Sequence, residues 1–172
     1  MRQRALTGFT AMIISLATLT AAAPARAANN VAQVQANVVK PLILTSLQNL
    51  DLGTMTLGPG TWSNATVAIS KAGVFSCTNA NVICTGATQV ATYNVSGTNN
   101  RVVLITAPNV TLVNQGDPTK TLTLVVDKSA SVLLTNSGPP GTNFSIGGSI
   151  SLSSTTVSGT YSGTFNVTVD YQ

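Results

Sequence analysis

Thr164-Phe165-Asn166-Val167-Thr168-Val169-Asp170-Tyr171, which precedes the final residue Gln172, alternates strictly between polar and apolar residues. In an extended strand, Phe165, Val167, Val169 and Tyr171 point to one face, and the residues between them point to the other. This period of two predicts a β-strand with one buried face. The stretch decides the fold class, because shorter segments of the same kind recur through most of the chain.

Strand-like segments rich in Val, Ile, Leu and Thr are separated by turns of Gly, Pro, Asn and Asp. The pattern predicts further strands at residues 66–70, 91–95, 102–106, 110–113, 121–126 and 131–135. Residues 53–60, with three glycines and a proline, are interpreted as a turn-rich stretch. Eight or more short strands predict an all-β fold, an antiparallel two-sheet sandwich, with a closed barrel as the alternative.

Residues 1–27 have the layout of a signal peptide. A short basic start is followed by a run of small and apolar residues, and Ala25-Arg26-Ala27 places small residues where a signal peptidase reads them. We expect cleavage between Ala27 and Ala28, leaving a single domain over residues 28–172. A retained membrane anchor is the alternative; no second apolar run of spanning length follows. The mature chain is therefore expected to be exported to the periplasm, the outer surface or the medium, without a transmembrane segment.

Charged residues are scarce, at 7% of the chain, and neither His nor Glu is present. Nucleophilic sites that depend on an imidazole, and zinc sites with His ligands, are therefore excluded. Asp51, Asp117, Asp127 and Asp170 show no pairing pattern, and Asp51 is expected to cap backbone groups of a glycine turn. Without residues 1–27, five cations against four aspartates leave a charge of +1. We expect no enzymatic activity, cofactor, metal site or nucleic-acid partner.

Cys77 and Cys84 are the two cysteines of the chain. In an oxidising compartment two cysteines have one possible pairing, so we expect a disulfide that closes a short loop. A redox-active pair is the alternative, but a Cys-x-x-Cys spacing is absent.

Motifs near both ends resemble those of an uncharacterised family of secreted bacterial proteins. Leu50-Asp51-Leu52-Gly53 is similar to a Leu-Asp-Phe-Gly signature near the start of that family, with Leu52 in place of Phe. Ile146-Gly147-Gly148-Ser149-Ile150 and the stretch from Gly159 to Tyr171 resemble its closing motif. The resemblance covers about residues 31–172. This family looks related to spore coat protein U-like secreted pili proteins and, more remotely, to chaperone–usher pilins, which implies an immunoglobulin-like, pilin-like sandwich.

The likeness to pilins can be followed at the carboxy terminus. Pilins end in an alternating strand with a penultimate aromatic residue and a glycine fourteen places from the end, and here these are Tyr171 and Gly159. In pilins a periplasmic chaperone reads this strand, which later lies beside a strand donated by the next subunit. The resemblance thus implies an assembly strand of Gly159, Phe165, Val167, Val169 and Tyr171. It also implies a second copy of the chain and a periplasmic chaperone as partners.

The amino-terminal part of the domain has a second alternating segment. Ala32, Val34, Ala36 and Val38 alternate with polar residues. Residues 28–40 are compatible with the first strand of a complete sandwich, which we favour slightly because pairing within one chain avoids the entropic cost of association. They are also compatible with a donor strand, although two alanines bury little apolar area.

These observations predict a non-enzymatic, exported bacterial structural protein, a pilin-like or surface-assembly subunit. The alternative is a self-complete secreted or periplasmic module, adhesin-like, that binds glycans or a protein partner. Trp62 with Asn64, or Tyr93 with Asn94, would supply the aromatic and amide groups of a sugar site. Trp62 is, however, expected to pack in the core or at its rim.

Overall fold

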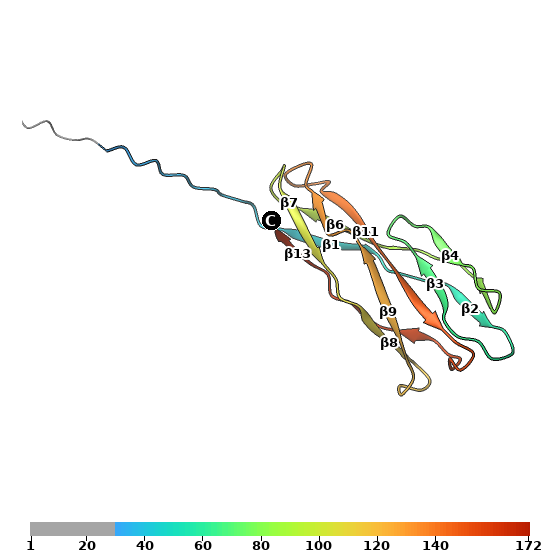
Figure 1. The fold of residues 1–172 in the computed structure, drawn as a ribbon. Coiled ribbons are helices and arrows are strands. Elements are labelled where there is room, and N and C mark those ends of the chain that lie inside the picture. The colour runs from blue at the N-terminus through green and yellow to red at the C-terminus, as the bar shows by residue number, and fades with distance from the viewer. Residues whose placement is uncertain (1–29) are drawn as a thin grey trace, which may run out of the picture. The chain divides into compact units, whose positions relative to one another are not determined.

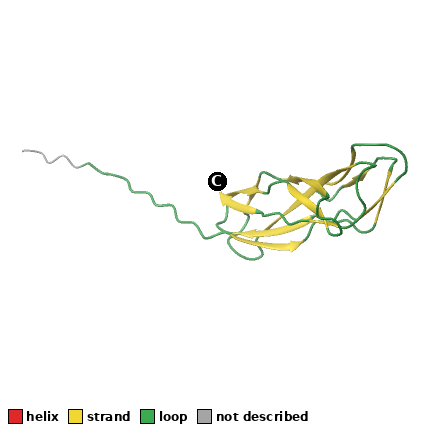
Figure 2. Cartoon of the chain, turned by 90° about the horizontal axis from the view of Figure 1, so that it is seen from below, coloured by secondary structure: helices red, strands yellow, loops and turns green. Residues whose placement is uncertain are grey.

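The computed structural model describes residues 30–172, and contacts divide the chain into two units after Ala36. The predicted signal peptide and its cleavage site between Ala27 and Ala28 lie outside the described residues. Residues 30–36 contain no strand and are exposed. The described chain contains strands and loops but no helix (Figure 2).

All strands lie in residues 37–172 (Figure 1). In chain order they are β1 (Ile43–Gln48), β2 (Thr54–Leu57), β3 (Ala65–Ile69), β4 (Phe75–Cys77), β5 (Val82–Thr85), β6 (Ala91–Ser96), β7 (Val102–Thr106), β8 (Val110–Asn114), β9 (Thr121–Lys128), β10 (Ser131–Leu133), β11 (Thr142–Leu152), β12 (Tyr161–Ser162) and β13 (Thr168–Tyr171). The largest sheet has the order β1-β6-β11-β9-β8-β12, with β3 paired to β11 and β4 paired to β3. A three-stranded sheet has the order β10-β7-β13, and β2 pairs with β5.

Two hydrophobic clusters lie between the large sheet and the smaller ones. The first joins β6 and β11 to β7 and contains Ala91, Val95, Val103, Ile105, Ala107, Leu134, Phe144 and Ile146. The second joins β3, β9 and β11 to β5 and contains Ala65, Val67, Val82, Leu124, Ile150 and Leu152. Because every ladder is antiparallel and the apolar faces meet between sheets, the predicted all-β antiparallel sandwich is confirmed.

Strand β11 is the longest strand and the centre of the large sheet. Residues 142–146 pair with β6, residues 148–152 pair with β3, and residues 146–149 pair with β9. Ile146 has partners in both β6 and β9, and Gly148 has partners in both β3 and β9. Strands β6 and β3 therefore share one edge of β11 in succession, while β9 occupies the other edge.

The glycines of the Ile146–Ile150 motif lie where β11 changes partner. A Cβ atom on Gly147 would collide with the carbonyl oxygen of Ile69 and with the backbone of Ser70 and Lys71. A Cβ atom on Gly148 would lie 2.8 Å from the Leu124 side chain and 3.1 Å from the Val125 carbonyl oxygen. Close backbone approach therefore requires glycine at the point where β3 replaces β6.

We predict that Gly147→Ala destabilises the domain by about 3 kcal/mol, because the added methyl group meets backbone atoms that cannot rotate away. Urea unfolding of the purified domain measures this change. Gly116→Ala is the control, since its Cβ atom would lie 3.4 Å from the nearest atom, the Asn114 side-chain oxygen. Equal losses of stability in the two variants would contradict this account of Gly147.

The ends of the chain differ from what the sequence alone predicts. The first strand expected within residues 28–40 is absent from the described part of that segment: the structure has no strand between residues 30 and 42, and β1 begins at Ile43. In the last eight residues, Phe165, Val167, Val169 and Tyr171 are partly buried, as the alternation predicts. Only β13 of this stretch, however, forms a ladder, and its partner is β7. The supposed turn-rich stretch at residues 53–60 contains β2.

An ion pair connects the turn between β3 and β4 with β9. The Asp127 carboxylate accepts the Lys71 backbone N–H at 2.8 Å and lies 3.3 Å from the Lys71 ammonium nitrogen. The backbone N–H of Lys71 is the main cause that lowers the pKa of Asp127, and burial opposes it. A carboxyl group whose pKa is lowered in the folded state stabilises that state above its unfolded pKa, about 3.9, and loses this effect as the pH falls through the folded pKa.

Asp127→Asn is therefore expected to lower stability near pH 6 by about 0.5 kcal/mol, a small effect because both side chains are half exposed. The difference from the unmodified domain should shrink as the pH falls through the folded-state pKa of Asp127, since the carboxylate becomes protonated in both states. Denaturant titrations at several pH values measure it. A difference that does not change with pH would show that charge is not involved.

Candidate functional site

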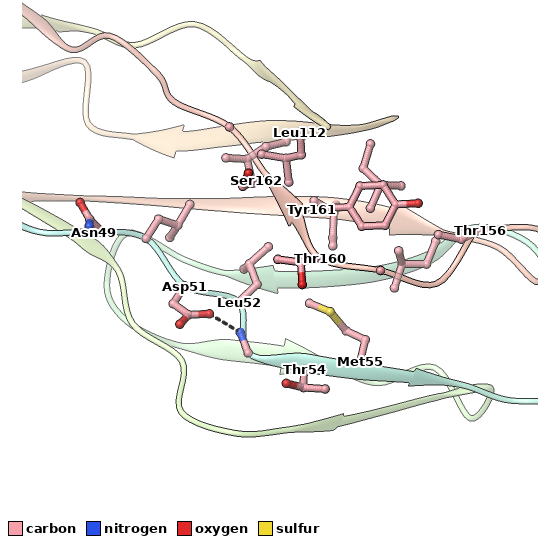
Figure 3. A pocket seen from close by; sticks show the side chains of 18 of the residues that line it. Asn49, Asp51, Leu52, Thr54, Met55, Leu112, Thr156, Thr160, Tyr161 and Ser162 are labelled. Atoms are coloured by element: carbon pink, nitrogen blue, oxygen red, sulfur yellow. Dashed lines mark hydrogen bonds between the residues drawn. The ribbon is translucent and has the colours of Figure 1, made fainter. Parts of the chain in front are cut away.

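An open groove with a volume of about 990 Å³ lies between two segments near the ends of the domain. Residues 49–57 form one wall and residues 156–165 form the other. Figure 3 shows Thr54 and Met55 on one side and Tyr161 and Ser162 on the other. The floor comes from the second hydrophobic cluster and its neighbours: Leu112, Leu122, Leu124, Ile150 and Leu152.

The first wall is shaped by the Leu50-Asp51-Leu52-Gly53 motif. Asp51 exchanges two backbone hydrogen bonds of 2.9 Å with Gln89, and its side chain accepts the Gly53 N–H at 2.8 Å. Gly53 has a φ of +77°, and a Cβ atom there would lie 2.8 Å from the Thr85 carbonyl oxygen. The predicted capping role of Asp51 is thus confirmed, and the motif turns the chain from β1 into β2.

The second wall is anchored by Asn114, which is buried at the end of β8. Its amide nitrogen donates to the Ser158 carbonyl oxygen at 3.1 Å, and its oxygen accepts the Gly116 N–H at 2.8 Å. Gly159 has a φ of +145°, and a Cβ atom there would lie about 2.5 Å from the Asn114 amide. The glycine fourteen places from the end therefore lets the wall lie against β8. No local sequence signal marked Asn114 for this role.

Both walls present a strand edge without a partner among residues 30–172. Strand β2 pairs only with β5, and β12 pairs only with β8. Residues 163–167, which continue the second wall, belong to no ladder. The groove therefore combines an apolar floor with unpaired backbone groups at its sides, the two features that an added β-strand satisfies.

The groove contains few groups that could take part in acid–base chemistry. Asp51 is its one carboxylate, and that group already accepts the Gly53 N–H. Burial raises the pKa of the Tyr93 hydroxyl, and a hydrogen bond with Ser46 partly offsets this. Over the described part of the chain, no three His, Cys, Asp or Glu side chains gather closely enough to hold a metal ion. This arrangement suits the binding of an apolar, extended segment.

The structure brings most of the predicted assembly strand to one region. Gly159 and Phe165 line the groove, while Val167, Val169 and Tyr171 pack against the first cluster. The other predicted segment has no such contacts: Ala32, Val34, Ala36 and Val38 are exposed, with Val34 and Val38 at 93% and 88%.

Three residues of the two candidate sugar-binding pairs make contacts within the domain. Trp62 is partly buried against the second cluster, and its indole N–H donates to the Gly58 carbonyl oxygen at 3.1 Å. Tyr93 stacks on Phe144 with ring centroids 5.6 Å apart. Asn94 follows it on the opposite face of β6 and donates to the Pro140 carbonyl oxygen at 2.8 Å. Tyr93 and Asn94 therefore do not form an aromatic platform with a free amide beside it, whereas Asn64, near Trp62, is exposed.

The Cys77–Cys84 disulfide is present, as predicted, and it connects two sheets. Cys77 ends β4, which belongs to the large sheet through β3, whereas Cys84 lies in β5, the partner of β2. Both cysteines pack against the second cluster. The disulfide thus ties the first wall of the groove to the body of the domain.

We predict that Cys77→Ser/Cys84→Ser keeps the fold but lowers its stability by about 2–3 kcal/mol, because the closed loop is short. The increase in local opening should be concentrated in β2 and β5. Hydrogen exchange should therefore accelerate there while β11 amides stay protected. Uniform acceleration over all strands would contradict the assignment of the disulfide to the groove wall.

These features define an all-β sandwich domain with an open, apolar groove, bordered by strand edges that have no partner among residues 30–172. The chain belongs to the family described as Domain of unknown function (DUF4402), whose model matches residues 42–171. Searches of curated proteins and of solved structures found no match. In the described part, no helix is both long and apolar enough to cross a membrane.

Proposed function

We propose that this protein is a non-enzymatic, exported bacterial structural subunit, pilin-like in assembly, whose groove accepts a β-strand from another copy. Before assembly, a periplasmic chaperone would occupy the same edges. The observation that carries the proposal is that β2 and β12, on either side of one apolar groove, each keep one edge without a partner among the described residues. A strand inserted there would gain backbone hydrogen bonds on two sides and bury its apolar side chains on the floor.

Residues 28–40 are the proposed donor. Their described part is exposed and outside any strand, yet Ala32, Val34, Ala36 and Val38 repeat with the period of two that a strand with one buried face requires. Ten extended residues span about 33 Å. Because Ala32 and Ala36 bury little area, backbone pairing would supply much of the binding energy.

The carboxy-terminal segment supports the same proposal from the receiving side. Strand β13 pairs only with β7 among the described residues, so its second edge is also free. Phe165 and Val167 lie between β12 and β13; Phe165 packs against both clusters and Val167 against the first. The resemblance of this segment to the closing strand of pilins adds to the argument.

The first test is a denaturing gel of surface and periplasmic fractions from the native cell, with unheated samples beside boiled ones. Subunits joined by inserted strands should give a ladder of bands that is reduced to one band on boiling. The reason is that the complex between subunits is kinetically stable in detergent until the domains unfold. One band near the mature mass under both conditions would contradict strand exchange. That result would favour a self-complete secreted or periplasmic binding module.

A variant that fills the groove tests the site itself. Thr160 lines the groove and its side chain is exposed, so Thr160→Trp should abolish the ladder while the monomer remains folded. Thr111→Trp is the matched control, since Thr111 is also exposed, lies on β8 and does not line the groove. Ladders of equal strength in the two variants would show that the groove is not the site of assembly.

A further inference from the structure

The penultimate residue of the chain is hydrogen-bonded to Lys40, which lies shortly before β1. The Tyr171 hydroxyl donates to the Lys40 carbonyl oxygen at 2.7 Å and accepts the Thr98 N–H at 2.7 Å. The Lys40 N–H in turn donates to the Thr98 hydroxyl oxygen at 2.7 Å. These three hydrogen bonds form a closed ring among three separate segments, which we call the Tyr171 latch.

The surroundings of the latch hold it in one geometry. A Cβ atom on Gly97 would collide with the Tyr171 hydroxyl and lie 2.8 Å from the Leu42 side chain and 3.0 Å from that of Leu134. Leu42 and the Tyr171 ring both pack against the first cluster. The Tyr171 hydroxyl therefore reaches Lys40 across a position where only glycine fits.

The latch engages both the N–H and the carbonyl oxygen of Lys40, and these bonds affect how residues 31–39, which precede Lys40, can pair. Strand β1 pairs only with β6 among the described residues, so its other edge is free. A reversal at residues 40–42 would lay residues 31–39 along that edge as an antiparallel hairpin, and a three-residue connection is a common hairpin length. In the latch, however, the N–H and the carbonyl oxygen of Lys40 are directed to Thr98 and Tyr171.

We infer that the Tyr171 latch prevents residues 31–39 from pairing with β1 of their own chain and so keeps them available to a second copy. The inference rests on the proposed function and adds its regulation. Tyr171 is the last residue of β13, and it also determines which strand edge the donor segment can reach. Tyr171 is here a positioning residue, because it acts on the donor through Lys40.

Hydrogen exchange on the full mature monomer tests the inference with Tyr171→Phe, which keeps the ring and removes the hydroxyl. A second variant, Thr98→Val, removes only the acceptor for the Lys40 N–H. Thr98→Ser retains that acceptor and is the matched control. We expect residues 31–39 to exchange without protection in the unmodified protein and in Thr98→Ser, and at least about tenfold more slowly in the two latch variants, where the hairpin forms.

Unprotected residues 31–39 in both latch variants would overturn the inference. Loss of protection throughout β11 in both variants would overturn it as well, because the ring would then serve only the stability of the fold. The gel of surface fractions distinguishes a failure of the latch inference from a failure of the proposed strand exchange. A ladder in the unmodified protein together with unprotected latch variants would retain strand exchange and reject the latch, and absence of any ladder would reject strand exchange itself.

Discussion

The rest of the structure depends on the pairing of β11, in which β6 and then β3 occupy the same edge. The change of partner occurs at Gly147, where the backbone of residues 69–71 leaves no space for a Cβ atom. Strand β3 then carries β4, and the Cys77–Cys84 disulfide joins β4 to β5 and hence to β2. Strands β1 and β2 therefore pair in different sheets, and the chain must cross between sheets at residues 49–53.

The carboxy-terminal side repeats this arrangement. Strand β12 pairs with β8 of the large sheet and β13 with β7 of the three-stranded sheet, so residues 163–167 also cross between sheets. The groove lies where the two crossing segments leave their ladders, and within the described part of the chain its edges have no further strand partner. A groove of this kind exposes apolar surface and strand edges, which folded proteins normally cover. This is the physical reason to propose that a strand from another chain completes the sandwich.

Several local features could be predicted from residues alone. The alternation at residues 164–171, the strands at residues 102–106 and 121–126, the cap formed by Asp51 and the pairing of Cys77 with Cys84 all follow from patterns a few residues long. The candidate site was only partly predictable. Gly159 and Phe165 were marked by the resemblance at the carboxy terminus, whereas Asn114, which shapes the same wall through Ser158 and Gly159, is one asparagine among many in this chain.

The sequence by itself determined the fold class and which residues of most strands face the interior, because a period of two reports the burial of each side chain. Only the tertiary structure decided which edges are paired: β2 within a glycine-rich stretch, β11 across Gly147 and Gly148, and no partner for residues 30–42. Pairing depends on contacts between residues far apart in the chain, such as Tyr171 with Lys40. A local pattern predicts a strand but does not specify its neighbour.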